Sequence, residues 1–445
     1  MRIAIVGTGI SGLGCAHALR RVGGFDITVY EAATRLGGHT NTVDVVIDGK
    51  SFAVDTGFLV FNERAYPSLV RLLGELDVPI AASEMTFAVS LPVSGRFGTR
   101  SLEWCDSNLN GIFAQRRNLA SPPFWRMLAD IVRFNRQAAR FAQTADASEG
   151  NDISLGEFLD QHRFSEPFRN WYLLPMAGAI WTCPPATMLR YPLHTFVGFC
   201  HNHGLLQVTR RPRWFAVRGG ARQYVLAIAD RLPDVRVDDP VLAVERNESS
   251  GQVQVTSRHG RENFDHVVLA CHGDQTLRLL LDADFGERSL LAPVRFLRNR
   301  AVLHTDIRLL PQQRAVWSAW NYMSSGGASP DLSVTYLLNK LQPLPTMTPV
   351  LLTLNPLRLP DPARTIAEFD YEHPIFDAAA IAALRRLPKQ QGRRRLWFAG
   401  AWTGYGFHED GLRSGLAVAQ GLCGLAQGLP PPAGQDAWPT TAIAA

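Results

Sequence analysis

The chain has 445 residues, more than one compact core holds, which predicts two or three domains. Hydrophobic residues make up 46% and charged residues 19%, as in ordinary globular enzymes. The small excess of 45 basic over 40 acidic residues, without a nucleic-acid-binding motif, argues against a nucleic-acid partner.

Three further features indicate a cytoplasmic protein. The six cysteines are scattered and form no CxxC pair, which is typical of reduced thiols. The N-terminal apolar run is broken by glycines, unlike a signal peptide. The chain also lacks the roughly 18 consecutive apolar residues of a membrane span.

The first 31 residues follow the order strand, glycine-rich turn, helix, strand. Arg2 to Val6 is a short apolar run typical of a buried parallel strand. Ser11 to Val22 predicts a helix, and Phe25 to Glu31 predicts a second strand. This order predicts a βαβ unit.

The turn of this unit carries the run GTGISG at residues 7–12. Gly7 permits a tight turn, Gly9 lets the backbone approach a pyrophosphate, and Gly12 lets the helix pack on the strand. The helix that opens at Ser11 offers free N–H groups to phosphates. Glu31 ends the second strand 24 residues after Gly7, where a carboxylate suits the adenosine ribose. We therefore predict dinucleotide-binding roles for Gly7, Gly9, Ser11, Gly12 and Glu31.

Farther along, Phe52 to Phe61 is an apolar segment and Tyr66 to Leu76 predicts a helix. Residues 100–205 are rich in aromatics and have helical periodicity, most clearly at Ser121 to Gln143. Its apolar face contains Phe124, Met127, Leu128, Ile131, Phe134, Ala138 and Phe141, and its basic face contains Arg126, Arg133, Arg136 and Arg140. Such a helix either lies on a membrane surface or packs on the core.

Residues 205–285 return to strand patterns. Gln252–Ser257 and Asp265–Cys271 read as a hairpin around a polar turn. Four more strands are predicted in the segments RAVLHTDI, AVWSAWNYM, LSVTYLLN and VLLTLN of residues 300–355. The tail from Leu429 is rich in proline and alanine and is expected to be disordered. The pair His201 and His203 lacks a matched third ligand, so no metal site is predicted.

The segment EAATRLGGH at residues 31–39 resembles the E-x-x-x-R-x-G-G-R pattern of the flavin amine oxidase and phytoene desaturase superfamily. The resemblance implies that this segment adds to the pyrophosphate site through Ala32, Arg35, Gly38 and His39. His39 stands where the family has its final arginine.

A second resemblance is to the C-terminal motif of the same superfamily, FAGAWTGYGFHEDGLRSG at residues 398–415. In the family this turn meets the ribityl chain and the flavin ring, which implies cofactor contacts from Gly400, Ala401, Asp410, Gly411 and Leu412. Ala401 stands where an acidic residue is common. This segment contains no cysteine, which predicts non-covalently bound FAD.

Weaker matches complete the predicted cofactor site. The run DTGF at residues 55–58 resembles a family segment that approaches the flavin, which implies contacts from Gly57 and Phe58. Val241 stands where the family places a backbone contact to the adenine. The run Arg218-Gly-Gly220 precedes a predicted helix.

The segments WFAVRGGARQYV, YLLNKLQPL, LLTLNP and GFHEDGL resemble a bacterial FAD/NAD-binding subgroup linked to modification of unsaturated fatty acyl chains. The C-terminal motif of the superfamily implies that His408 and Glu409 lie near the flavin, where a histidine can move a proton at neutral pH. Lys340 resembles in context a lysine that holds a water near flavin N5. We take these three as candidate catalytic residues.

We therefore predict an α/β fold with a Rossmann-type FAD-binding domain and a second mixed-sheet substrate domain that carries a helical insertion. The FAD-binding domain is assigned residues 1–80, 205–290 and 390–428. The substrate domain is assigned 81–204 and 291–389, and 429–445 the disordered tail.

The predicted function is an FAD-dependent oxidoreductase. It moves a hydride between a C–H or C=C of an apolar, fatty acyl-like substrate and flavin N5, as a desaturase or double-bond isomerase. One alternative is an FAD amine oxidase with an aromatic cage from Trp402, Tyr405 and Phe407. Another is a non-catalytic lipid-binding escort protein. The expected partner is an apolar small molecule or lipid, with possible peripheral contact to the inner face of the membrane.

Overall fold

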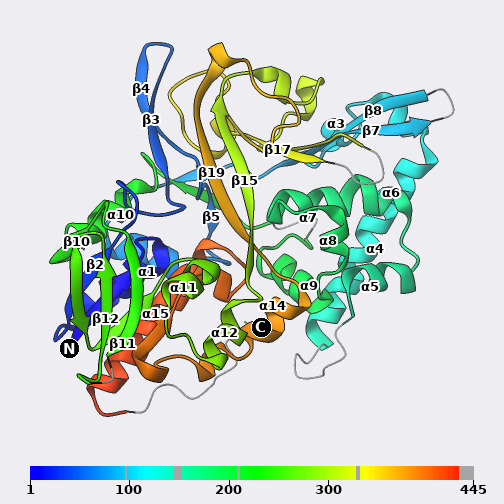
Figure 1. The fold of residues 1–445 in the computed structure, drawn as a ribbon. Coiled ribbons are helices and arrows are strands. Elements are labelled where there is room, and N and C mark those ends of the chain that lie inside the picture. The colour runs from blue at the N-terminus through cyan, green and yellow to red at the C-terminus, as the bar shows by residue number, and fades with distance from the viewer. Residues whose placement is uncertain (96–97, 145–152, 208–210, 248, 327–330, 430–445) are drawn as a thin grey trace.

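The fold is seen in a computed structural model that describes residues 1–95, 98–144, 153–207, 211–247, 249–326 and 331–429 (Figure 1). Strand β1 (Arg2–Val6), helix α1 (Ile10–Val22) and strand β2 (Asp26–Tyr30) form the predicted βαβ unit. They belong to a five-stranded sheet of order β10-β2-β1-β14-β20 in which every neighbouring pair is parallel. The three other strands are β10 (Asp234–Arg236), β14 (His266–Leu269) and β20 (Leu396–Phe398).

The predicted hairpin of Gln252–Ser257 with Asp265–Cys271 is wrong. Strand β12 (Gln252–Ser257) pairs antiparallel with β11 (Val241–Asn247) and with β13 (Gly260–Phe264). The fully buried β14 instead pairs parallel with β1. The reason is that the polar sequence GRENF, where the pattern predicts a turn, itself forms the strand that returns along β12.

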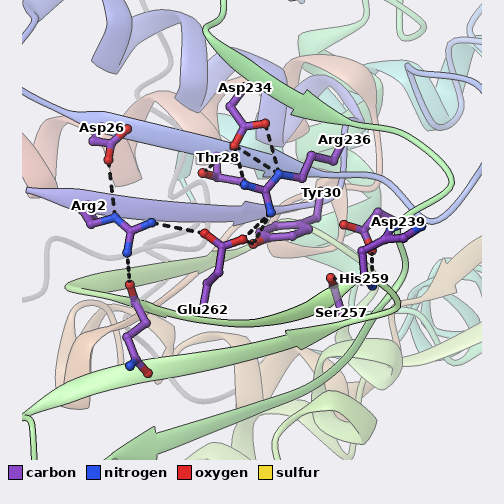
Figure 2. Close-up of polar contacts among 11 residues, drawn as sticks. Arg2, Asp26, Thr28, Tyr30, Asp234, Arg236, Asp239, Ser257, His259 and Glu262 are labelled. Atoms are coloured by element: carbon purple, nitrogen blue, oxygen red, sulfur yellow. Dashed lines mark hydrogen bonds and ion pairs between the residues drawn. The ribbon is translucent and has the colours of Figure 1, made fainter.

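A polar cluster joins this three-stranded sheet to the edge of the parallel sheet (Figure 2). The Arg236 guanidinium of β10 lies between Asp234, at 2.8 Å, and Glu262 of β13. The Arg236 carbonyl accepts the Glu31 N–H at 2.8 Å, and the Glu31 carbonyl accepts the Asp239 N–H at 2.9 Å. These bonds hold Glu31 at the carboxyl end of β2, beside the dinucleotide turn.

The second large sheet has seven strands in the order β19-β15-β18-β17-β16-β7-β8. Neighbours are antiparallel except β16 and β7. The strands are β7 (Phe87–Gly95), β8 (Gly98–Cys105), β15 (Arg295–His304), β16 (Trp320–Ser324), β17 (Leu332–Leu337), β18 (Leu351–Leu354) and β19 (Thr365–Ile375). They include the four strands predicted in residues 300–355.

The predicted helical insertion follows β8. Its α-helices are α3 (Leu109–Ile112), α4 (Pro122–Thr144), α5 (Leu155–Gln161), α6 (Glu166–Phe168), α7 (Leu174–Trp181), α8 (Pro185–Leu189) and α9 (Leu193–Asn202). In Figure 1 the insertion and the parallel sheet lie on opposite sides of the long strands β15 and β19. The molecule is thus an α/β protein with a parallel sheet and a separate mixed sheet.

Helix α4 confirms the predicted helix at Ser121–Gln143, and it packs on the core. Phe124, Met127 and Phe134 are at most 1% exposed. The Arg133 guanidinium lies 2.9 Å from the Asp130 carboxylate and 4.1 Å from the centre of the Phe164 ring. The apolar face that a membrane would need is therefore used inside the protein. Among the described helices, none is long and apolar enough to cross a membrane.

Further elements are two small antiparallel sheets and three helices. Strands β3 (Thr42–Ile47) and β4 (Lys50–Asp55) form a hairpin, and β9 (Trp214–Val217) pairs with β5 (Phe61–Asn62) and β6 (Ile80–Ser83). Helix α2 (Pro67–Glu75) confirms the helix predicted after Tyr66, and α10 (Arg222–Ala229) follows the Arg218-Gly-Gly220 run as expected. The long helix α15 (His408–Ala426) packs on α1. The predicted disordered tail lies outside the described residues except for Leu429.

Candidate active site

Of the three glycines of the dinucleotide turn, only Gly9 has open space beside it. A Cβ atom added to Gly7, whose φ is +108°, would lie 2.9 Å from the Ala270 carbonyl oxygen. A Cβ atom on Gly12 would lie 1.9 Å from the Gly7 carbonyl oxygen. At Gly9 the same atom would meet nothing within 4 Å. Gly7 and Gly12 therefore serve packing, whereas the room beside Gly9 can take a phosphate group at the N-terminus of α1.

The Glu31 carboxylate is oriented by the dinucleotide turn itself. One of its oxygens accepts the Thr8 N–H at 3.1 Å and the Thr8 hydroxyl, and the other accepts the Ala33 N–H at 2.9 Å. Carboxylate oxygens have further acceptor positions, and Glu31 lines the cavity described below. This is the arrangement that a ribose diol would require.

Replacing Glu31 by alanine is expected to weaken FAD binding by about two to four orders of magnitude. A charge-assisted hydrogen bond to each ribose hydroxyl contributes about 1.5–3 kcal/mol, and the variant also loses the bonds to Thr8. Flavin retained through dialysis measures the effect. A Glu31→Ala protein that keeps its full flavin content would show that the carboxylate does not bind the ribose.

The EAATRLGGH segment closes over this turn. The Arg35 guanidinium donates to the Gly38 carbonyl at 2.8 Å, and a Cβ on Gly38 would lie 3.2 Å from Gly9 Cα. The DTGF segment docks against the same loop, because a Cβ on Gly57 would lie 2.0 Å from the His39 carbonyl oxygen. The two segments are therefore neighbours, as the resemblance implies.

The C-terminal motif forms β20, a short turn and the start of α15. The Ser414 hydroxyl accepts the Gly400 N–H at 2.9 Å and donates to the Gly411 carbonyl at 2.7 Å. A Cβ on Gly415 would lie 2.0 Å from the Ser11 carbonyl oxygen, so α15 crosses α1 in backbone contact. The turn at Gly400 and the turn at Gly9 are thus brought to one place.

These segments surround one cavity of about 980 Å³. The predicted residues that line it are Gly7, Gly9, Ser11, Glu31, Arg35, Gly38, His39, Gly57, Phe58, Gly400, Ala401 and His408. The predicted residues outside its lining are Gly12, Ala32, Val241, Asp410, Gly411, Leu412, Glu409 and Lys340. Gly12 and Gly411 lie in the contact between α1 and its neighbours, and the Asp410 carboxylate accepts the Phe407 N–H at 2.9 Å at the start of α15.

His408 lies in the wall of the cavity as the first residue of α15. Its ring stacks on Phe58, with centroids 3.8 Å apart and planes 9° apart. Its Nε2 is 2.7 Å from the Tyr224 hydroxyl, which in turn bonds the Thr40 hydroxyl. Burial lowers the pKa of His408 to about 3, so the imidazole is neutral at pH 7 and a weak base. The geometry favours hydrogen bonding over proton transport by this residue.

The structure brings neither Glu409 nor Lys340 to the cavity. The buried Glu409 carboxylate accepts the Ser68 N–H at 2.9 Å and the Leu69 N–H at 3.0 Å, at the N-terminus of α2. Those amides have no partner within their own helix. The Lys340 ammonium pairs with Glu84 at 2.7 Å. These contacts indicate structural roles for both side chains.

Glu409→Ala is therefore expected to lower the free energy of unfolding by about 2–5 kcal/mol, because two buried amides lose their acceptors. Glu409→Gln keeps one acceptor oxygen and should lose about half as much. Chemical unfolding of the flavin-loaded variants measures this. A Glu409→Gln protein of unchanged stability that has lost its turnover would instead support a catalytic role.

A histidine cluster beside the predicted cofactor site was not expected from the sequence. The ring centroid of His39 lies 5.3 Å from Tyr371, 5.7 Å from His373 and 6.0 Å from His272. Burial, and then the neighbouring histidines, hold the pKa of His39 well below its usual range. Within the described part of the chain, its buried Nε2 has no hydrogen-bond partner. This nitrogen is available to a molecule bound in the cavity.

The rest of the cavity is mostly apolar. Helices α7 and α9 contribute Met176, Ile180, Trp181 and Phe199, and the mixed sheet contributes Phe87, Trp320 and Tyr336. Trp181 and Trp320 each keep a buried Nε1–H that lacks a partner among the described residues. No group of three or more potential ligand side chains in the described structure is placed to hold a metal ion.

The donor set fits FAD. The open backbone at Gly9, the N-terminus of α1 and the Glu31 carboxylate suit the two phosphates and the adenosine ribose. The turns at Gly57 and Gly400 and the unpartnered His39 Nε2 line the same cavity farther along. The residues therefore offer one continuous site to a long dinucleotide.

Comparisons with solved structures agree on the fold. A putrescine oxidase in complex with putrescine superposes with a TM-score of 0.67 at 18% identity, covering 95% of this chain and 99% of that one. The cyclohexylamine oxidase of Brevibacterium oxydans IH-35A gives 0.66 at 18% identity, covering 96% and 99%. A CLA-producing fatty acid isomerase from P. acnes gives a TM-score of 0.65 at 13% identity, covering 94% of this chain and 98% of that one.

No curated protein matches the chain in sequence. Residues 10–302, more than half of the chain, match the family model described as flavin containing amine oxidoreductase. That stretch runs from α1 through the insertion into β15. It includes Glu31, the DTGF segment and the whole helical insertion. The chain is therefore an FAD-dependent oxidoreductase that belongs to the flavin containing amine oxidoreductase family.

Proposed function

We propose that the enzyme oxidises or isomerises an apolar chain of fatty acyl type at a C–H or C=C bond. The observation that carries the proposal is the apolar lining of the cavity beyond the predicted cofactor site. Helices α7 and α9 supply Met176, Ile180, Trp181 and Phe199 to this wall. A site for a small polar amine would not need so long an apolar surface.

When bound, FAD supplies the hydride acceptor, so the side chains need only position the reacting bond and hold polar groups. In the proposed arrangement the aromatic walls hold the chain by burial of its methylene groups. The neutral His408, fixed by Phe58 and Tyr224, keeps its side of the site free of charge. The unpartnered Nε2 of His39 offers a hydrogen bond to the bound molecules.

We also propose the two-domain division, with residues 1–80, 205–290 and 390–428 binding FAD. It is supported by the parallel sheet, whose five strands all fall in these segments. The segments 81–204 and 291–389 contain all seven strands of the mixed sheet together with the helical insertion. The substrate would then bind between the two domains.

The alternative is oxidation of an amine. Trp402, Tyr405 and Phe407 all line the cavity, and Phe407 stacks on Phe199 with centroids 4.6 Å apart. Aromatic walls can receive a neutral or cationic amine. The escort-protein alternative is not retained, because the family is one of oxidoreductases. Peripheral membrane contact receives no support from α4, whose apolar face is buried.

Anaerobic incubation tests the proposal. The flavin-loaded enzyme is mixed with oleate, with oleoyl phospholipid, or with putrescine and cyclohexylamine, and the flavin spectrum and lipid products are recorded. We expect the acyl ligands to bleach or perturb the flavin, or to emerge with a shifted double bond. Bleaching by an amine, with no spectral or chemical effect of any acyl ligand, would overturn the proposal in favour of amine oxidation.

A further inference from the structure

We propose that the guanidinium of Arg213 binds the anionic end of the substrate chain at the mouth of the cavity. The ligand chemistry is an oxyanion carried on an apolar chain, either the carboxylate of a free acid or the phosphate of a phospholipid. This inference rests on the proposed function, since it names how an acyl-type substrate would be oriented. It follows from the distribution of charge around the cavity.

Two of the three carboxylates that line the cavity outside the nucleotide end pair with an arginine. Asp106 pairs with Arg211 at 2.6 Å, and Asp370 pairs with Arg298 at 2.7 Å. The third, Glu372, lies 3.2 Å from Nδ1 of His272, and burial lowers the pKa of this histidine, so the ring is neutral at pH 7 and does not neutralise the carboxylate. The carboxylate without a cationic partner therefore lies beside the histidine cluster near the predicted cofactor site, and none lies in the described part of the lining around β9.

Arg213 differs from the other arginines of the lining. It is exposed while lining the cavity, which places it at an opening. Within the described residues, no acidic side chain pairs with it, whereas Arg211 and Arg298 each have one. Arg35, at the nucleotide end, donates to the Gly38 carbonyl. On the β9 side of the cavity, the formal charge that no carboxylate of the described lining compensates is thus positive and lies at Arg213.

The surface that begins at Arg213 is apolar. The next residue, Trp214, starts β9 and lines the cavity, as does Phe215. Across the mixed sheet, Phe87 is in register with Trp320, whose ring lies 5.1 Å from Tyr336. A chain whose charged end stays at Arg213 can bury its methylene groups along these rings, so one cation would fix its direction.

The test uses flavin-loaded protein and measures ligand affinity from the perturbation of the flavin spectrum. The probes are oleate, methyl oleate and oleoyl lysophosphatidylglycerol. Wild type should bind the two anionic probes at least about tenfold more tightly than the uncharged ester, since a charge-assisted bond is worth that much. Arg213→Gln should remove this preference and leave ester binding unchanged. Arg213→Lys should keep most of it.

The control is Arg71→Gln, which removes an exposed arginine of α2 outside the cavity lining and should behave as wild type. Whichever anionic probe binds more tightly identifies the source of the oxyanion. Equal affinities for oleate and its ester, or an Arg213→Gln protein with the wild-type preference, would overturn the inference. Failure of the proposed function looks different, because then neither acid nor ester perturbs the flavin.

Discussion

Gly9→Ala is expected to give a folded protein that no longer holds flavin, whereas Gly12→Ala should lose folded protein and flavin together. Gly9 has φ −61° and ψ 172°, a conformation open to any residue, and its Cβ would meet nothing within 4 Å. The added methyl group enters the space assigned to the pyrophosphate. The free energy of unfolding should therefore fall by only about 0.5–1 kcal/mol, because alanine is a poorer helix N-cap than glycine.

At Gly12 two effects oppose each other. Alanine favours a helix over glycine by about 1 kcal/mol. The new Cβ, however, would lie 1.9 Å from the Gly7 carbonyl oxygen and 3.3 Å from Ala270 Cβ. Overpacking costs about 1–3 kcal/mol, or more when the backbone must move. The clash therefore outweighs the gain in helix propensity, and the net effect is a loss of stability.

Gly74→Ala is the matched control, because this glycine lies in α2 with nothing within 4 Å of its added Cβ. It should gain up to about 1 kcal/mol and keep its flavin. Flavin content and chemical unfolding with and without added FAD distinguish the three variants. A Gly9→Ala protein with full flavin would show that the dinucleotide does not approach this backbone.

The parts of the fold that could be predicted are those with a local signal. The strand, the glycine turn and the helix of residues 2–22 each have their own periodicity or spacing, and all three form as expected. Strand β13 lacked such a signal, because only Phe264 of its five residues is buried and the rest are polar or glycine. The sequence pattern therefore predicts a hairpin of β12 with β14, although the apolar β14 lies within the parallel sheet, beside β1.

The candidate site likewise has a part that could be predicted from local motifs and a part that could not. Residues of contiguous motifs, such as Gly9, Glu31 and His408, line the cavity. The histidine cluster joins His39 to His272 and His373, which are more than 200 residues away and follow or occupy strands of different sheets. Glu409 caps a helix more than 300 residues earlier, and such a contact leaves no pattern in either segment.

Acidification from pH 7 to pH 5 is expected to destabilise the flavin-loaded protein by about 4 kcal/mol. Burial lowers the pKa of His203, His304 and His373 to about 4 and that of His408 to about 3. Unfolding restores about 6.5, so between these values the unfolded chain binds more protons and stability falls as pH falls. Together, these four histidines lower the free energy of unfolding by about 7 kcal/mol between pH 7 and pH 5.

Two buried carboxyls oppose this loss. Burial raises the pKa of Asp55 to about 6 and that of Asp410 to about 7. At pH values above the unfolded-state pKa, each carboxyl binds more protons in the folded protein than in the unfolded chain. Between pH 7 and pH 5 the two together therefore raise the free energy of unfolding by about 3–4 kcal/mol. The destabilising contribution of the histidines is larger because they are more numerous. His39, whose pKa is also lowered, adds to this contribution.

His304→Gln isolates one member of this set, remote from the cavity. The His304 Nε2 lies 2.8 Å from the Thr353 hydroxyl, and its Nδ1 accepts the Asp306 N–H at 3.0 Å, a pattern that requires the neutral ring. The variant should be less stable than wild type at pH 7, since the bonds of a fully buried ring are disturbed. It should also lose about 2 kcal/mol less than wild type on going to pH 5, because glutamine does not titrate. Urea unfolding at both pH values measures the two differences separately. An unchanged pH dependence in His304→Gln would show that protonation of this ring does not contribute to the acid sensitivity, whatever the variant's stability at pH 7.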